Sequence, residues 1–150
     1  MGMSFSTLGQ PTTKVLIAGY YGSGNAGDEA ILSCLLAELR ARIPNLRPTV
    51  ISAEPNTTSA AYGVDSIAKT DKSAIVAAIQ DCALVVLGGG GLLQDYWDVD
   101  LSPIFSSTPA ALSYYAYAAL ALVFDKPLVL YAIGVGPISA PAGRLYTPVT

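Results

Sequence analysis

The sequence contains no histidine and few charged residues. Charged side chains make up 13% of its 150 residues, and the net charge is only −3. Histidine is the side chain that most readily exchanges protons near neutral pH, so any acid–base chemistry must use other groups or another chain. The basic residues are scattered, and only Arg40, Arg42 and Arg47 come near to a cluster. This distribution favours neither a nucleic-acid partner nor an anionic membrane surface.

Cysteines and long apolar runs are also scarce. Cys34 and Cys82 are the only cysteines and lie far apart, which favours two buried free thiols in a cytosolic protein over a disulfide. The most apolar stretch, residues 110–124, is too short to span a bilayer. Residues 1–13 lack the basic start and apolar core of a secretory signal. We therefore predict a cytoplasmic protein without a transmembrane segment.

Apolar side chains, in contrast, are abundant. They make up 52% of the chain, which excludes disorder and allows one domain with a sizeable core. Short β-like runs alternate with helical patterns, and this alternation predicts an α/β fold with a doubly wound, Rossmann-like parallel sheet. The predicted strands are 14–18, 49–52, 65–68, 83–87 and 128–133, and the predicted helices are 27–42, 57–62, 72–80 and 109–124.

Local signals fix several of these helices. Asp71 is a good N-cap for the third helix, and Gly63 is suited to end the second. Asn25 fits either an N-cap or a ligand contact, and we expect the cap. In the first helix the predicted apolar stripe consists of Ile31, Cys34, Leu35 and Leu39.

Three glycine clusters each follow a predicted strand, at residues 19–27, 88–91 and 134–136. The carboxyl ends of parallel strands lie on one edge of a sheet, where α/β folds bind ligands. Glycine also lets the backbone approach a ligand closely. We therefore expect three loops on one edge, and a binding site there.

The first cluster has two interpretations. Residues 22–27 match GxGxxG, and Glu54 ends the second predicted strand, as in a dinucleotide-binding fingerprint. Asp28 and Glu29, however, occupy the first helical turn, where they would repel a pyrophosphate. Asp28 is favoured instead as an acceptor of hydrogen bonds from sugar hydroxyls, with stabilisation of the helix dipole as the structural alternative.

The other polar candidates surround the later clusters. Four consecutive glycines at 88–91 favour close backbone approach or an amide nest for an anion, and Gln94 and Asp95 follow them. Asp95, with Asp98 and Asp100, fits a solvated acidic loop better than a metal site. Tyr20, Tyr21, Tyr96 and Trp97 are candidates either to stack on sugars or to fill the core. Arg144 is suited to grip a carboxylate or phosphate, or is a lone surface arginine.

Three segments together resemble the polysaccharide pyruvyl transferase family, in its CsaB-like group. They are residues 19–30 (GYYGSGNAGDEA), 88–95 (GGGGLLQD) and 133–138 (IGVGPI), and the resemblance runs from about Lys14 to Arg144. It implies a two-domain, GT-B-like fold with its active site in the cleft between the halves. It also implies transfer of pyruvate from phosphoenolpyruvate to a sugar of a cell-wall glycan or of its lipid-linked precursor, without a metal or cofactor.

The resemblance also implies roles for particular residues. Arg144, Gly89 and Gly90 would bind the donor, and the residues lining the acceptor side of the cleft would be Tyr21, Asn25, Asp28, Gln94 and Asp95. Family members are more than twice this length, and their second half supplies the catalytic histidine. We therefore expect a loose N-terminus at 1–13, an N-terminal domain at 14–137 and a truncated tail at 138–150, active only with a complementary C-terminal half.

Two other interpretations stay open on the sequence. One is an NAD(P)-binding Rossmann module of an oxidoreductase, based on GxGxxG and Glu54. The other is a non-catalytic sugar-binding or interaction domain whose apolar surface pairs with another chain.

Overall fold

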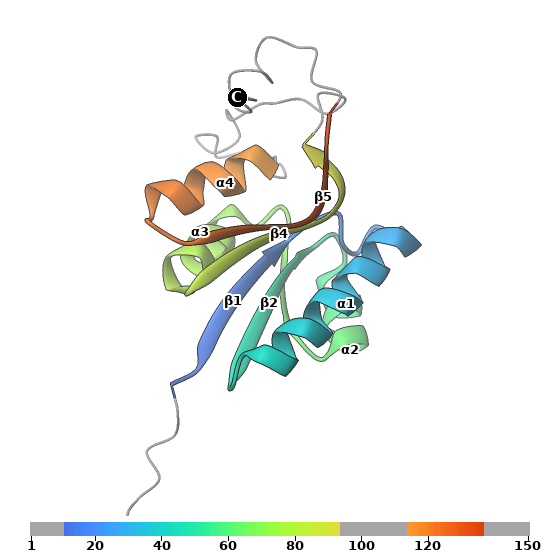
Figure 1. Ribbon diagram of the computed structural model, residues 1–150, viewed down its shortest axis with the longest axis horizontal. Coiled ribbons are helices and arrows are strands. Elements are labelled where there is room, and N and C mark those ends of the chain that lie inside the picture. Colours follow the sequence, from blue (N-terminus) through green and yellow to red (C-terminus); the bar gives the residue numbers. More distant parts are fainter. Residues whose placement is uncertain (1–10, 94–113, 137–150) are drawn as a thin grey trace, which may run out of the picture.

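The computed structural model describes residues 11–93 and 114–136, which form a parallel sheet with helices on both faces (Figure 1). Every predicted strand and helix has a counterpart there. The elements are β1 (Thr13–Ala18), α1 (Ala26–Arg42), β2 (Leu46–Ser52), α2 (Pro55–Tyr62), β3 (Asp65–Ala68), α3 (Lys72–Asp81), β4 (Leu84–Leu93), α4 (Tyr114–Val123) and β5 (Leu128–Val135).

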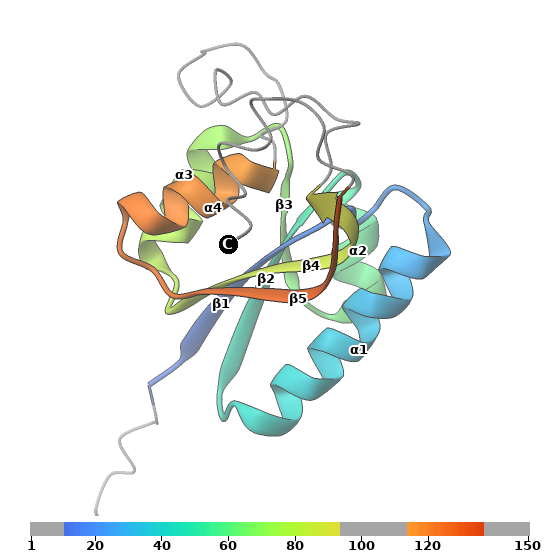
Figure 2. The same ribbon diagram turned by 45° about the horizontal axis from the view of Figure 1, so that its top comes forward.

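The five strands lie in the order β3-β2-β1-β4-β5, and every neighbouring pair is parallel. Successive side chains of a strand point to opposite faces of the sheet. In β1, Val15 and Ile17 pack toward α1, while Leu16 and Ala18 pack toward α3 and α4. Figure 2 shows α1 and α2 on one face of the sheet and α3 and α4 on the other. The predicted doubly wound α/β fold is confirmed.

The predicted helix caps are also confirmed. The Asn25 side chain accepts a hydrogen bond from the backbone N–H of Gly27 and caps α1, and Asp71 caps α3 in the same way through the N–H of Ala74. Gly63 ends α2 in the left-handed conformation. These short-range signals were readable because a cap depends on only a few neighbouring residues.

The apolar stripe predicted for α1 was partly wrong. The helix buries Asp28, Leu32, Leu35 and Leu36 against the sheet, while Cys34 is exposed. The buried positions follow the i, i+4, i+7, i+8 spacing of one helix face, so the helix is rotated relative to the predicted stripe. As a consequence, a carboxylate at the start of α1 faces the sheet. Both cysteines are free, and only Cys82 is buried.

The predicted loop at residues 88–91 was wrong as well, because these glycines continue β4. Gly88 pairs with Tyr131 and Gly90 with Ile133 of β5, and the register shifts between Gly90 and Leu93. The glycine cluster at the end of β5 likewise begins inside the strand, since β5 extends to Val135. Apolar residues alone marked the predicted strand ends, whereas backbone pairing carries both strands further.

β2 begins at Leu46, earlier than the predicted strand start at residue 49, and so includes Pro48. β2 pairs with β3 only from Thr49 onward, so one side of the strand has no neighbouring strand at Pro48. Proline has no backbone N–H to donate to a neighbouring strand, so it is tolerated where such a strand is missing.

The predicted loose N-terminus and truncated tail fall mostly outside the described residues, which exclude 1–10 and 138–150. Thr13, which was predicted to belong to the loose N-terminus, is the first residue of β1.

Candidate functional site

The centre of the sheet contains a topological switch point between β1 and β4. From β1 the chain continues through α1 to β2 on one side, whereas from β4 it continues through α4 to β5 on the other. Open α/β sheets bind ligands outside the carboxyl ends of strands at such a point. The first glycine cluster follows β1, and the other two lie at the carboxyl ends of β4 and β5. Their predicted position on one edge is confirmed.

Tyr21 holds the two central strands together at this edge. Its side chain is buried, and its hydroxyl donates a hydrogen bond of 2.7 Å to the carbonyl oxygen of Gly88. A Cβ on Gly88 would lie 2.7 Å from that hydroxyl, and a Cβ on Gly19 would overlap both the Tyr21 ring and the Gly88 carbonyl. These two glycines therefore make room for Tyr21, which supports the edge from the core side.

Asp28 contributes a buried carboxylate to this edge of the sheet. Its side chain comes from the sheet-facing stripe of α1, and the residue is only 7% exposed. Its Oδ1 atom lies against the end of β4, 3.3 Å from the position of a Cβ on Gly89 and 2.7 Å from that on Gly90. Burial raises the pKa of Asp28, and the nearby Glu29 carboxylate raises it further. Within residues 11–93 and 114–136, no group donates a hydrogen bond to the Asp28 carboxylate.

Glu29 has a different role, because its carboxylate is fully engaged. Oε1 accepts a hydrogen bond of 2.8 Å from the backbone N–H of Gly22, and Oε2 accepts one of 2.7 Å from the Tyr62 hydroxyl. Burial, with the Glu29 hydrogen bond as the next cause, raises the pKa of Tyr62 to about 12. Glu29 thus ties the first glycine loop to α1 and α2.

These contacts bear on the dinucleotide interpretation. The Gly22 amide, which in a dinucleotide fold would be available to a pyrophosphate, is taken by the chain's own carboxylate. A Cβ on Gly22 would also overlap the Ser52 hydroxyl at the end of β2, so this glycine serves internal packing. Glu54 is exposed and precedes α2 without a side-chain cap hydrogen bond.

Tyrosine side chains lie near Asp28 at this edge. Tyr20 is 41% exposed beside the buried Tyr21. Burial raises the pKa of Tyr114 to about 12, and the charge of Asp28 and the Tyr20 hydroxyl contribute after it. The pKa of Tyr21 is raised by burial first and by Asp28 next. Sequence reasoning missed Tyr114 because it placed this residue inside a longer helix, whereas α4 as described begins there.

Of the predicted site residues, the structure brings together Tyr21, Asp28, Gly89 and Gly90. Asn25 stands at the start of the same helix and is occupied by capping. Gln94, Asp95 and Arg144 lie outside the described residues, as do Tyr96, Trp97, Asp98 and Asp100.

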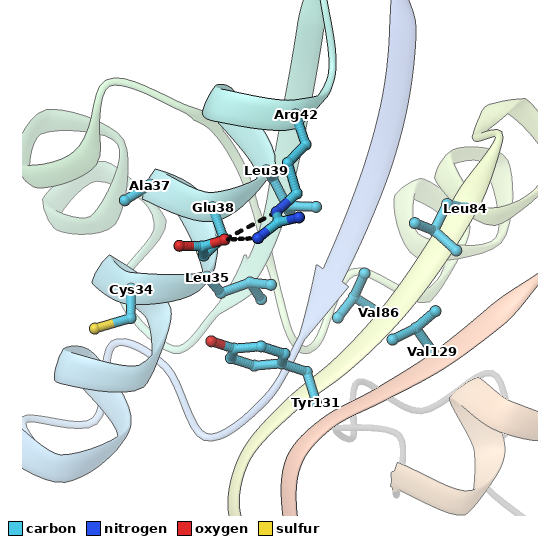
Figure 3. Close-up of a pocket in the computed structure, with 10 residues that line it drawn as sticks. All are labelled: Cys34, Leu35, Ala37, Glu38, Leu39, Arg42, Leu84, Val86, Val129 and Tyr131. Atoms are coloured by element: carbon cyan, nitrogen blue, oxygen red, sulfur yellow. Dashed lines mark hydrogen bonds and ion pairs between the residues drawn. The ribbon is translucent and has the colours of Figure 1, made fainter.

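A groove of about 640 Å³ lies on the face of the sheet that α1 covers, between the later turns of α1 and the strands β4 and β5 (Figure 3). Its walls are mainly apolar, and the ion pair between Glu38 and Arg42 runs along one side. Leu35 and Tyr131 line the groove and also approach Gly88. The groove thus extends from near Gly88 toward the amino ends of β4 and β5, away from the edge where the glycine clusters lie.

Among residues 11–93 and 114–136, no group of three or more histidine, cysteine or acidic side chains is placed to hold a metal ion. None of the helices there combines the length and the apolar character that crossing a bilayer requires.

Comparison with known proteins gave one match. A profile of the polysaccharide pyruvyl transferase family matches residues 25–147. The match covers most of the chain and includes Asn25, Asp28 and the glycines of β4. Comparisons with curated proteins and with solved structures gave no significant match.

Proposed function

Because the chain belongs to the polysaccharide pyruvyl transferase family, we propose that the protein transfers pyruvate from phosphoenolpyruvate to a cell-wall glycan or its lipid-linked precursor. The product is a ketal formed with two hydroxyls of one sugar, and phosphate leaves. The observation that carries this proposal is the family match, which runs from the cap of α1 across the switch point. The occupied Gly22 amide gives the oxidoreductase alternative no comparable support.

The chemistry requires a specific set of partners. Protonation of the enol carbon creates an electrophilic centre that a sugar hydroxyl attacks, so the site needs a general acid, cations around the donor and hydrogen-bond partners for the acceptor. In this proposal Gly89, Gly90 and Arg144 bind the donor. The acceptor side is formed by Tyr21, Asn25, Asp28, Gln94 and Asp95. Tyr21 acts from the core through its bond to Gly88.

A complementary C-terminal half is part of the proposal, because the chain has no histidine to act as the acid. Exposed apolar side chains support such a partner. On α4, Leu122 and Val123 are 75% and 74% exposed, and on β5 Leu130 and Val135 are 53% and 59% exposed. Exposed apolar residues gathered on neighbouring elements mark interaction surfaces. The free cysteines fit a cytoplasmic location for the reaction.

The test is a direct assay of the protein, together with the complementary C-terminal half that the proposal requires, with phosphoenolpyruvate and methyl glycosides of hexoses and N-acetylhexosamines with free 4- and 6-hydroxyls. We expect phosphate release that depends on the glycoside, and a glycoside product whose mass shows an added pyruvate ketal. Quenching of intrinsic fluorescence by phosphoenolpyruvate, and not by NAD, is expected in the same protein. NAD binding without ketal formation would overturn the proposal in favour of the oxidoreductase.

Arg144 offers a second test. If its guanidinium binds the donor, Arg144→Ala raises the KM for phosphoenolpyruvate or lowers kcat by roughly tenfold or more. Arg47→Ala is the control, because Arg47 is exposed and pairs with Asp65 far from the switch point. Equal kinetics for the two variants would remove Arg144 from the site.

A further inference from the structure

We propose that Asp28 is the general base of the reaction and takes the proton from the sugar hydroxyl that attacks the donor. This inference rests on the proposed function and deepens it by giving one residue a chemical role. Asp28 is more than nine-tenths buried, and no hydrogen-bond donor among the described residues satisfies its carboxylate. The Asp28 carboxylate oxygens are not sealed from solvent, so they can accept a hydrogen bond from a ligand bound at this edge.

The position of Asp28 points to where that partner sits. The side chain leaves α1 on the face turned toward the sheet, and Oδ1 lies over Gly89 and Gly90 at the end of β4. Both glycines have positive φ, of 95° and 68°. The carboxylate therefore lies against the backbone at the carboxyl end of β4, on the edge where this fold class binds ligands.

The surroundings of Asp28 suit a base rather than an ion-pair partner. Among the described residues, Glu29 on the same helix raises the pKa of Asp28, and Asp28 in turn raises the pKa values of Tyr21 in the loop after β1 and of Tyr114 at the start of α4. None of these is a cation, and Glu29 adds a like charge. A carboxylate in such surroundings holds a proton more readily than an exposed one, which makes it a better proton acceptor.

Glu29 does not compete for this role, although it is the next residue. Both of its carboxylate oxygens are already hydrogen-bonded, to the Gly22 amide and to the Tyr62 hydroxyl. The two neighbouring carboxylates are therefore divided in function. Glu29 positions the loop, and Asp28 remains open to a substrate.

The proton transfers balance in the following way. As the sugar oxygen bonds to C2 of the donor, its proton passes to Asp28, while C3 takes a proton from the general acid of the complementary half. Asp28 then gives its proton to the bridging oxygen as the C2–O bond to phosphate breaks. The second hydroxyl closes the ketal ring, and its proton restores the general acid.

The experiment compares Asp28→Asn with Glu38→Gln in the protein combined with its complementary C-terminal half, using the glycoside and phosphoenolpyruvate assay over a range of pH. Glu38 lies on the same helix, but it is exposed and pairs with Arg42. We expect Asp28→Asn to lower kcat by roughly 100-fold or more while the KM for phosphoenolpyruvate stays nearly unchanged. Glu38→Gln should behave as the wild type.

The pH profile separates a base from a structural residue. In the wild type, kcat/KM should fall on the acid side with a midpoint above the ordinary aspartate pKa, and Asp28→Asn should abolish this fall. If Asp28→Asn keeps most of kcat, or keeps the acid limb, Asp28 is not the base, while ketal formation by the wild type still upholds the proposed function. If the wild type forms no ketal and binds no phosphoenolpyruvate, the proposed function falls and the role of Asp28 falls with it.

Discussion

The Oδ1 atom of Asp28 lies 2.7 Å from the position that a Cβ atom would occupy on Gly90. Asp28 lies in the first turn of α1 and Gly90 near the end of β4, and they meet because β1 and β4 are neighbours in the sheet. No side chain larger than hydrogen fits on Gly90 while Asp28 keeps its position. The buried position of the Asp28 carboxylate therefore depends on a glycine at residue 90.

Gly90→Ala tests this contact. Alanine would combine a left-handed backbone with overlap against Asp28, and we expect a loss of about 2–4 kcal/mol in the free energy of unfolding. The control is Gly24→Ala, where φ is also positive (75°) but no atom lies within 4 Å of the new Cβ. It should cost only about 1 kcal/mol. Urea unfolding measures both, and equal losses would show that Asp28 does not occupy this position in solution.

The Asp28–Gly90 contact also shows where prediction from sequence stops. Strand and helix order, the caps at Asn25 and Asp71, and the shared edge of the glycine clusters were all predictable, because each depends on local pattern or on parallel topology. The continuation of β4 through Gly88–Gly91 was not, because it depends on pairing with β5. The burial of Asp28 was not predictable either, since a charged residue in the first turn of a helix normally faces solvent.

The raised pKa of Asp28 predicts a pH-dependent change in stability. The folded state binds the proton of Asp28 more tightly than the unfolded state does, so Asp28 lowers stability once the pH exceeds its unfolded pKa of about 3.9. This penalty grows as the pH rises through the folded pKa and is then constant. We therefore expect Asp28→Asn to melt at a higher temperature than the wild type at pH 7.

The advantage of Asp28→Asn should shrink as the pH falls toward the ordinary aspartate pKa, because Asp28 is then neutral in both states. Asp81→Asn is the matched control. Its exposed carboxylate pairs with Lys14, which lowers its pKa, so this variant should show no gain at pH 7. A gain of the same size in both variants would trace the effect to net charge rather than to the burial of Asp28.

Glu29 and Tyr62 form the contact that holds the first glycine loop. Tyr62→Phe removes the hydroxyl bound to Glu29 Oε2, and we expect a loss of about 1–2 kcal/mol, as for a hydrogen bond to a charged group. Tyr20→Phe should change stability by less than about 0.5 kcal/mol, because Tyr20 is largely exposed. In the Glu29→Gln background, Tyr62→Phe should lower the free energy of unfolding by less than it does in the wild type. If the effects of the two substitutions simply add in this double-mutant cycle, the hydrogen bond between Tyr62 and Glu29 does not contribute to stability.

Ala132 is the strained residue of the edge strand. It has φ of 51° in β5, between two residues that pair with Gly88 and Gly90, and it stands opposite Gly89, whose φ is 95°. Two neighbouring strands therefore distort together at the carboxyl edge, beside the proposed site. A left-handed conformation costs a non-glycine residue roughly 1–2 kcal/mol, and such strain persists where the surrounding structure imposes it.

Ala132→Gly should accordingly stabilise the protein by about 0.5–1 kcal/mol, because glycine adopts this φ without steric cost and the gain exceeds its entropic penalty. Ala60→Gly is the control, since Ala60 is exposed within α2, and it should destabilise by about 1 kcal/mol. Urea unfolding should show changes of opposite sign in the free energy of unfolding for the two variants. If both variants are destabilised equally, Ala132 has an ordinary strand conformation, and the paired distortion of β4 and β5 does not exist in solution. If Ala132→Gly stabilises the protein but slows ketal formation, the strained edge contributes to positioning the substrate, because relaxing it leaves the fold intact and affects turnover alone.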